Sequence, residues 1–254
     1  VASAASAGSS RTTVRILARD MSSGSKLLML PVGHGEIAAG EQLLYITAGF
    51  GAEVRSLTHD RTEVARYEDQ DKLISHPVLG PGGLLFCVLF DESDPELDEI
   101  ITLDAQTLQP RHRFGLSMLR NACGLVVTEE ELFVCDTGND RLQVFSLAGE
   151  HRRSITGEWK GPVALCLVKD RLYLVEEADD ETGEEGELLS LRGRRIFVLS
   201  LQGDTLQVYT NPVEGHAFGG SMGPICCFDG KLLAPVQDVD ETGVFIEILA
   251  LRGV

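Results

Sequence analysis

The sequence lacks long apolar runs, since no window approaches the about eighteen consecutive apolar residues of a membrane-spanning helix. It has few aromatic residues, at 6% of 254, and few basic ones: 22 Lys and Arg stand against 39 Asp and Glu, which gives a net charge of −17. A chain this acidic is repelled by phosphate backbones and by anionic lipid, so nucleic acids and membrane surfaces are poor partners. The 43% of hydrophobic residues still supply enough apolar surface for one large core or two small ones.

The chain also lacks the cysteine patterns of a disulfide framework. Its six cysteines include no Cys-x-x-Cys pair and mostly lie in apolar runs such as Leu84–Leu89, and no Asn-x-Ser/Thr sequon occurs. Small buried thiols of this kind are typical of a reducing compartment, so we expect a cytoplasmic protein. Residues 1–10 have neither the basic nor the apolar region of a signal peptide. We interpret them as a flexible linker ahead of a single domain over 11–254.

What the chain does have is an internal repeat. A short apolar phrase occurs five times, with starts 40 to 60 residues apart, at Leu43–Ile46, Leu85–Val88, Leu132–Cys135, Leu172–Val175 and Leu232–Pro235. Another apolar stretch precedes each phrase, an alternating stretch follows it, and a fourth, more polar stretch completes most units. Short runs rich in Val, Ile and Leu and bounded by Gly, Asp and Asn predict β-strands. Four antiparallel strands in a unit of this length are typical of a propeller blade.

The predicted fold is therefore an all-β propeller with four-stranded antiparallel blades. The predicted blades span about 34–72, 76–115, 118–157, 160–214 and 218–254, the last one completed by 11–31. Val14–Leu17 is similar to the third strand of a blade, and the last unit stops after three strands. Pairing of the N- and C-terminal strands would thus close the ring. Five phrases favour five blades, with six as the alternative.

The third unit, Asn121–Gly157, resembles an NHL repeat. It has the Gly-Leu first strand, the apolar second strand that ends in Asp, the Thr-Gly-Asn-x-Arg turn and the Gln-Val-Phe third strand. The residues that carry the match are Gly124, Asp136, Gly138, Asn139 and Arg141. The other units match more loosely.

The resemblance implies a propeller, usually six-bladed in that family, which serves most often as a binding platform. Such domains select substrates in tripartite-motif ubiquitin ligases, bind RNA in regulators, or act as amidating lyases, and related lactonases depend on calcium. The motif residues themselves are predicted to be structural. Asp136 and Asn139 suit a turn in which side chains satisfy backbone N–H groups, and Gly138 allows a positive φ.

Acidic residues concentrate in the loops between second and third strands. In a propeller these loops share a face with the connections that lead into each first strand, so their carboxylates form an acidic rim that we expect to attract a basic protein partner. The alternative is a set of solvated loops that aid solubility. The rim consists of Asp91, Glu92, Asp94, Glu96, Asp98, Glu99, Glu176, Glu177, Asp179, Asp180, Glu181, Glu184, Glu185, Glu187, Asp238, Asp240 and Glu241. Scattered loop carboxylates form no cage, so we expect only weak calcium binding.

Three residues are candidate metal ligands. His34, His76 and Cys123 each lie nine residues before a second-strand phrase, at the head of a first strand. The amidating lyases place a zinc-binding histidine at this position. Zinc needs three or four converging ligands, and the other two units offer none. We therefore predict no zinc and no other cofactor.

No nucleophile elbow, Walker loop, dinucleotide fingerprint or zinc-protease motif occurs. We expect a non-catalytic, protein-binding NHL-type propeller that is a monomeric domain of a longer chain. One such setting is the substrate-recognition end of a ubiquitin-ligase-like protein. The first alternative is a metal-dependent propeller enzyme, amidating-lyase- or lactonase-like, that acts at the channel mouth. The second is RNA binding, which the negative charge disfavours.

Overall fold

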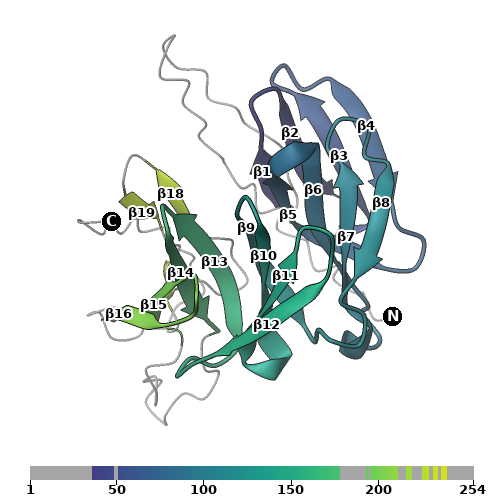
Figure 1. Cartoon of the computed structure of the whole chain (residues 1–254). Helices are drawn as coiled ribbons and strands as arrows, with labels where there is room; N and C mark the ends of the chain where they lie inside the picture. Colours follow the sequence, from purple (N-terminus) through teal and green to yellow (C-terminus); the bar gives the residue numbers. More distant parts are fainter. Residues whose placement is uncertain are drawn as a thin grey trace, which may run out of the picture.

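The computed structural model describes residues 36–48, 51–177, 193, 195–210, 216–218, 225–228, 231–233 and 236–238. Four antiparallel four-stranded sheets follow one another in chain order (Figure 1). The first contains β1 (Ile37–Ala39), β2 (Leu43–Ala48), β3 (Glu53–Thr58) and β4 (Glu63–Glu68). The second contains β5 (Leu73–Gly80), β6 (Leu84–Phe90), β7 (Glu99–Asp104) and β8 (Pro110–Phe114). The third contains β9 (Ala122–Val127), β10 (Glu131–Asp136), β11 (Arg141–Ser146) and β12 (His151–Thr156). The fourth contains β13 (Pro162–Val168), β14 (Arg171–Glu176), β15 (Arg195–Ser200) and β16 (Thr205–Thr210).

The order within each sheet is that of a propeller blade. Neighbouring strands in the chain pair as antiparallel hairpins, from the first strand to the fourth, as the repeat predicted. The Gly-rich segment after β5 forms the hairpin turn into β6 as a 3-10 turn, η2 (Pro81–Gly83), in which Gly82 and Gly83 adopt positive φ angles of 68° and 70°. Glycine adopts such angles at no steric cost because it has no Cβ atom.

Apolar side chains on both faces of the second strands explain why the sheets stack. In β6, Leu85 and Leu89 pack toward the first sheet, whereas Phe86 and Val88 pack toward the third. β10 repeats this pattern and β14 extends it, so each inner sheet buries both faces against its neighbours. Each fully buried Leu or Phe side chain contributes about 1.5–3 kcal/mol. The hydrophobic core is therefore divided among the spaces between sheets, and an isolated sheet would leave two apolar faces in water.

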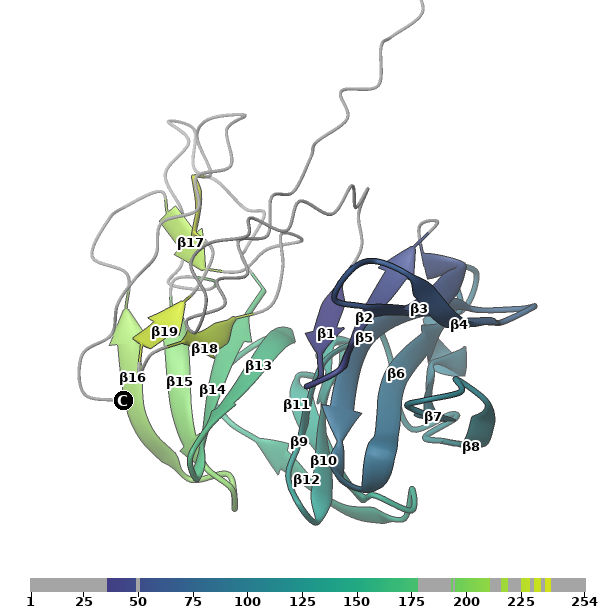
Figure 2. The same cartoon turned by 90° about the horizontal axis from the view of Figure 1, so that it is seen from above.

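A glycine sets the distance between the third and fourth sheets. A Cβ atom on Gly124 would lie 2.9 Å from Ala164 Cα and 2.9 Å from the Val163 carbonyl oxygen. β9 and β13 approach closely because Gly124 has no side chain. Seen from above, β9–β12 lie between the first two sheets and the fourth (Figure 2).

Beyond the fourth sheet, two short antiparallel pairs are present: β17 (His216–Phe218) with β20 (Val236–Asp238), and β18 (Cys226–Phe228) with β19 (Lys231–Leu233). β18 and β19 match the predicted first two strands of the last unit, and Ile225 and Leu232 join the core of the fourth sheet. The β17–β20 pair was not predicted. Its strands have three residues each, too few to show a period. The two terminal strands that were predicted to pair, Val14–Leu17 and the third strand of the last unit, lie outside the described residues.

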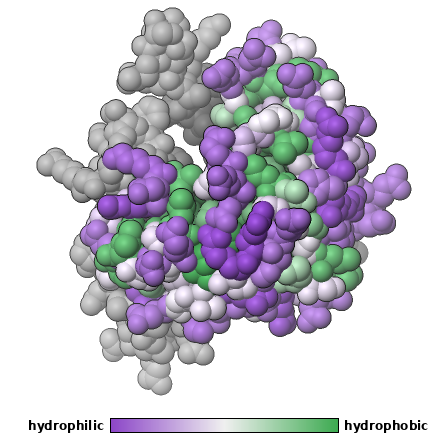
Figure 3. Space-filling view, in the orientation of Figure 1, coloured by the Kyte–Doolittle hydropathy of each residue, from purple (hydrophilic) through white to green (hydrophobic). Residues whose placement is uncertain are grey.

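Charged side chains cover the outer strands. Figure 3 shows hydrophilic residues over the side of the molecule where β4 and β8 lie, whose sequences are EVARYE and PRHRF. Charges on an edge strand discourage pairing with another sheet. Within the described part of the chain, no helix has the length and apolar character needed to cross a bilayer.

Candidate functional site

One face of the molecule is built from the turns between second and third strands together with the connections between sheets. Three connections lead into β5, β9 and β13, and each contacts such a turn. The amide of Ala122 donates to Asp98 Oδ2 at 2.7 Å, and the amide of Gly138 donates to the Arg120 carbonyl at 2.9 Å. Lys72 Nζ lies 2.8 Å from Glu99 Oε1. We call this surface the connecting face, and it is the face on which the sequence placed the acidic rim.

Three of the NHL-like residues, Asp136, Asn139 and Arg141, form a hydrogen-bonded group on the connecting face. Asp136, fully buried at the end of β10, accepts from the Arg120 amide at 2.8 Å, from Asn139 Nδ2 at 2.9 Å and from Arg141 Nε at 2.7 Å. The carboxylate thus joins its own turn to the connection before β9. A buried carboxylate is tolerated only when its oxygens are satisfied in this way. The sequence predicted that Asp136 and Asn139 satisfy backbone N–H groups of their own turn, but the backbone donor to Asp136 is Arg120, sixteen residues earlier, and Asn139 donates its side-chain amide to the carboxylate.

The role predicted for Gly138 needs a correction. The positive φ in this turn belongs to Asp140, at 55°, and not to Gly138. Gly138 is required for space, since a Cβ there would lie 2.8 Å from Arg120 Cγ and 3.0 Å from the Arg120 carbonyl oxygen. The glycine therefore lets the connection lie against the turn.

In the fourth sheet, a buried glutamate makes the same kinds of contact that Asp136 makes in the third. Glu176, at the end of β14, is fully buried and accepts from Arg195 Nε at 2.7 Å and from the Lys160 amide at 3.1 Å. Arg195 starts β15 as Arg141 starts β11. The sequence predicted Glu176 to be part of the acidic rim. That prediction is wrong, because its buried carboxylate links the start of β15 to the connection before β13.

Asp98 and Glu99 behave in the same way in the second sheet. Asp98 is 1% exposed and Glu99 7%. Asp98 accepts from the Asp91 amide at 3.3 Å as well as from Ala122, and burial raises the pKa of its carboxyl. Its carboxylate holds the loop between β6 and β7 against the start of β9.

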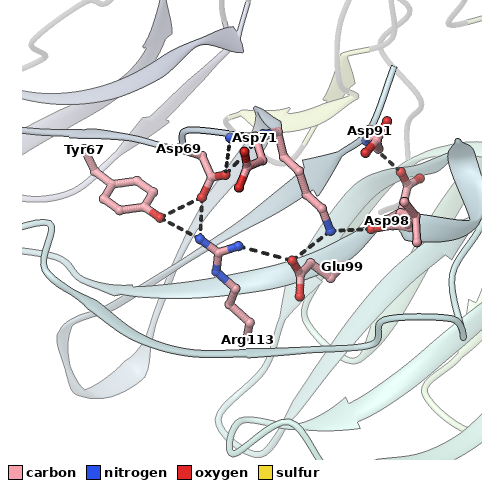
Figure 4. Close-up of polar contacts among 9 residues, drawn as sticks. Tyr67, Asp69, Asp71, Asp91, Asp98, Glu99 and Arg113 are labelled. Atoms are coloured by element: carbon pink, nitrogen blue, oxygen red, sulfur yellow. Dashed lines mark hydrogen bonds and ion pairs between the residues drawn. The ribbon is translucent and has the colours of Figure 1, made fainter. Parts of the chain in front are cut away.

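Glu99 belongs to a polar cluster between the first two sheets (Figure 4). Arg113 Nη1, from β8, lies 3.3 Å from Glu99 Oε1, and its Nη2 bonds to Asp69 and to the Tyr67 hydroxyl at 3.1 Å. Burial raises the pKa of Asp69, but hydrogen bonds from Tyr67 and backbone amides and the charge of Arg113 outweigh it, so the pKa is lowered. Asp69 remains ionised and holds Arg113 in place.

The remaining described carboxylates of the rim point outward. Glu92, Asp94 and Glu96 are exposed around the 3-10 turn η3 (Pro95–Leu97), and Glu177 is exposed after β14. Asp91 is partly buried, and its carboxylate accepts from the Ser93 amide at 2.8 Å. Eight rim residues, and the side chain of Asp238, lie outside what the structure describes: Asp179, Asp180, Glu181, Glu184, Glu185, Glu187, Asp240 and Glu241.

Two exposed leucines accompany these acids. Leu97 is 38% exposed at the end of η3, and Leu116 is 51% exposed in the connection between β8 and β9. That connection lies on the connecting face because its later residues, Arg120 and Ala122, make the contacts given above. The described rim thus offers apolar side chains among carboxylates.

A second cluster lies at the heads of the first strands. His76 Nδ1 is 2.7 Å from Glu36 Oε1, and Cys123, whose thiol donates to the Asn121 carbonyl at 3.5 Å, lies near enough to affect the pKa of His76. The three residues come from the first, second and third sheets. Burial lowers the pKa of His76, but the hydrogen bonds and charges of Cys123 and Glu36 outweigh it and raise the pKa to about 10. His76 is therefore an imidazolium at neutral pH.

The structure brings together two of the three candidate metal ligands, His76 and Cys123. His34 lies outside the described residues. Within the described residues, no group of three or more His, Cys, Asp or Glu side chains is placed to hold a metal ion. Sequence reasoning missed Glu36, which lies 40 residues before His76 and directly ahead of β1. It also missed Asp69 and Arg113, because their pairing depends on how two sheets pack.

Comparison with known proteins supports the fold alone. No family model matches the chain, and no curated protein is significantly similar to it in sequence. Many solved structures share its architecture. The WD40 β-propeller domain of Doa1 has a TM-score of 0.57 at 11% identity, over 78% of this chain and 58% of that one. The computationally designed Ika8 protein has a TM-score of 0.54 at 12% identity, over 80% of this chain and 55% of that one. A protein of unknown function from Desulfotomaculum acetoxidans DSM 771 has a TM-score of 0.56 at 11% identity, over 85% of this chain and 68% of that one.

The chain thus spans a little over half the length of the first two of these structures. Together with the four stacked four-stranded sheets, these matches identify the architecture as propeller-like.

Proposed function

We propose that this chain is a non-catalytic, NHL-type propeller that binds a basic protein segment on its connecting face. The observation that carries the proposal is the surface around η3, where the exposed acids Glu92, Asp94 and Glu96 share one loop with the exposed Leu97. Carboxylates attract and orient a basic partner, and apolar side chains at the centre of a contact supply most of its affinity.

The buried residues beneath this surface support a binding role. Asp98 and Glu99 fix the last residues of the Asp91–Glu99 loop through contacts with Ala122, Lys72 and Arg113. Asp98 also accepts from the Asp91 amide, which joins the two ends of the loop. A loop fixed in this way loses little conformational freedom on binding, so more of the contact energy remains as affinity. Propeller-like architecture as such is used for many purposes, and the resemblance to NHL repeats favours a binding platform.

The same proposal includes the finer points of architecture and setting. We infer five blades, closed into a ring by pairing of the N- and C-terminal strands, in a cytoplasmic protein. In a longer chain this domain would be the part that recognises a substrate, as in a ubiquitin-ligase-like protein.

A kinetic experiment tests the connecting face. The probe is a fluorescent 12-residue peptide of alternating Lys and Leu, and its association rate is measured by stopped flow at several salt concentrations. The variant Glu92→Gln/Glu96→Gln removes two charges from the connecting face. We expect its association rate at low salt to fall roughly two- to fivefold and the difference to fade as salt screens the charges.

The matched control removes the same charge from the opposite side. Glu129→Gln/Glu130→Gln changes two exposed acids in the hairpin between β9 and β10. We expect this control to retain the wild-type rate within about 1.5-fold, because the charges lie away from the proposed contact. Equal rates for both variants would mean that only net charge matters, and the proposal would fail. Leu97→Ser should separately raise the dissociation rate.

A further inference from the structure

We propose that the outer strand of the fourth sheet, β16, pairs with β16 of a second copy of this chain, so that two copies form a dimer through one continuous sheet. β16 pairs with β15 on one side, and in the part of the chain that the structure describes no strand occupies its other side. Figures 1 and 2 both show β16 as the outermost strand of its sheet. An edge of this kind presents backbone N–H and C=O groups that another strand can bind.

The composition of β16 distinguishes it from the other three outer strands. β4 (EVARYE), β8 (PRHRF) and β12 (HRRSIT) each carry two or more charged residues, whereas β16 (TLQVYT) carries none. Charged side chains on an edge strand discourage pairing with another sheet. β16 also contains neither Pro nor Gly, and its Thr, Val and Tyr residues favour the strand conformation. Among these four described strands, β16 is therefore the one whose sequence permits pairing with a further strand.

β16 also exposes apolar side chains. Leu206 is 52% exposed and Val208 is 41% exposed, and both lie on one face of the strand because side chains alternate. Val208 lies opposite Phe197 in the register of β15 with β16, so this is the face of the fourth sheet that packs against the third. Phe197 is buried there, whereas the two side chains of β16 remain in water. Covering them would remove apolar surface from water and stabilise a complex.

The same features explain why the occupant is a second copy. When two identical strands pair in antiparallel directions about a two-fold axis, residues that lie opposite each other are on the same face of the joined sheet. Leu206 and Val208 of one copy then lie beside the same two residues of the other, and all four side chains lose exposed surface. No like charges meet along the strand, since β16 has no charge. The pairing uses each edge once, so assembly ends at two copies.

The net charge of the chain makes the dimer dependent on salt. Each copy carries a charge of −17, so two copies repel each other at low ionic strength. Salt screens this repulsion and leaves backbone pairing and apolar contacts largely intact. The dimer therefore becomes tighter as salt rises, which is opposite to the binding of a basic peptide on the connecting face. A contact along six residues is small, so the dissociation constant is on the order of 10–100 µM.

Sedimentation equilibrium of the whole chain at several concentrations tests the proposal. We expect a monomer–dimer equilibrium whose dissociation constant is at least about threefold lower at about 0.5 M salt than at about 0.05 M. The variant Val208→Lys places a charge on the exposed face of β16 and should raise the dissociation constant at least about tenfold. The matched control, Val64→Lys, changes a valine that is 49% exposed on the charged strand β4. It alters the net charge by the same amount and should leave the dissociation constant within about twofold of the wild-type value.

Hydrogen exchange locates the contact. Amides of β16 should exchange more slowly above the dissociation constant than below it, and amides of β4 should exchange at the same rate in both conditions. Unfolding in urea shows that each variant is folded before its association is compared. A wild-type chain that stays monomeric at about ten times the expected dissociation constant would overturn the proposal. So would a dimer that Val208→Lys weakens no more than Val64→Lys, or growth beyond two copies.

Discussion

Replacing Asp136, the buried residue at the end of β10, gives a quantitative test of how its carboxylate stabilises the connection before β9. Asp136→Ala removes three contacts at once: with the Arg120 amide, with Asn139 and with Arg141. Removing one member of a buried ion pair costs about 3–5 kcal/mol, because the other charge and the buried donors lose their partner. Arg141 is 32% exposed and can reach water, so the lower end of that range applies. We expect a loss of about 3 kcal/mol in the free energy of unfolding.

The assay is equilibrium unfolding in urea. With a slope of about 2 kcal/mol/M, this loss would lower the midpoint by about 1.5 M. Asp136→Asn keeps one acceptor for the Arg120 amide and should lose only about 1–2 kcal/mol. Glu176→Ala removes the equivalent residue of the fourth sheet and should match Asp136→Ala.

An exposed ion pair supplies the control. Glu150 lies 3.6 Å from Arg152, and its side chain is 74% exposed. Glu150→Ala should change stability by no more than about 0.5 kcal/mol, since solvent screens such pairs. A loss below about 1 kcal/mol for Asp136→Ala, at an unchanged slope, would refute the reasoning that this carboxylate joins connection to turn.

Three other predictions concern packing, pH and closure. Gly124→Ala should lower the free energy of unfolding by about 1–3 kcal/mol, because its Cβ would lie 2.9 Å from Ala164 Cα. An unchanged free energy of unfolding in urea would mean that β9 and β13 can move apart to accommodate the methyl group. The pKa of His76 is raised from 6.5 to about 10, so its stabilising effect is complete below about pH 6.5 and is lost as the pH rises toward 10. Relative to His76→Asn, the wild type should therefore lose on the order of a few kcal/mol between pH 6.5 and 10, and parallel pH profiles of unfolding would contradict this. Deletion of Val1–Pro31 should lower the melting temperature of the whole domain in one cooperative transition, whereas an unchanged melting temperature would argue against closure by the N-terminal strands.

The burial of individual acids shows where sequence reasoning ended. The sequence offers no reason to expect different burial for four acids of the same loop: Glu92, Glu96, Asp98 and Glu99. The structure buries the last two, since they come where the chain turns back into β7 and meet the Ala122 amide and the Arg113 side chain. Those partners are 14 or more residues away in the sequence. No local pattern distinguishes a carboxylate that will find such a partner from one that will face water.

The sequence by itself determined the four strands of each unit, because side chains alternate along a strand and second strands such as Leu132–Cys135 must bury both faces. The contacts of Asp136 with Asn139 and Arg141 are also local, since they span three and five residues of the chain. The meeting of Glu36, His76 and Cys123 depends instead on how the sheets pack, since the three residues belong to different sheets. The need for glycine at position 124 also arises from packing, because β13 approaches β9 there. The physical reason is range: hydrogen bonding and alternation act between neighbours in the chain, whereas ion pairs and steric limits between sheets exist only after the sheets have stacked.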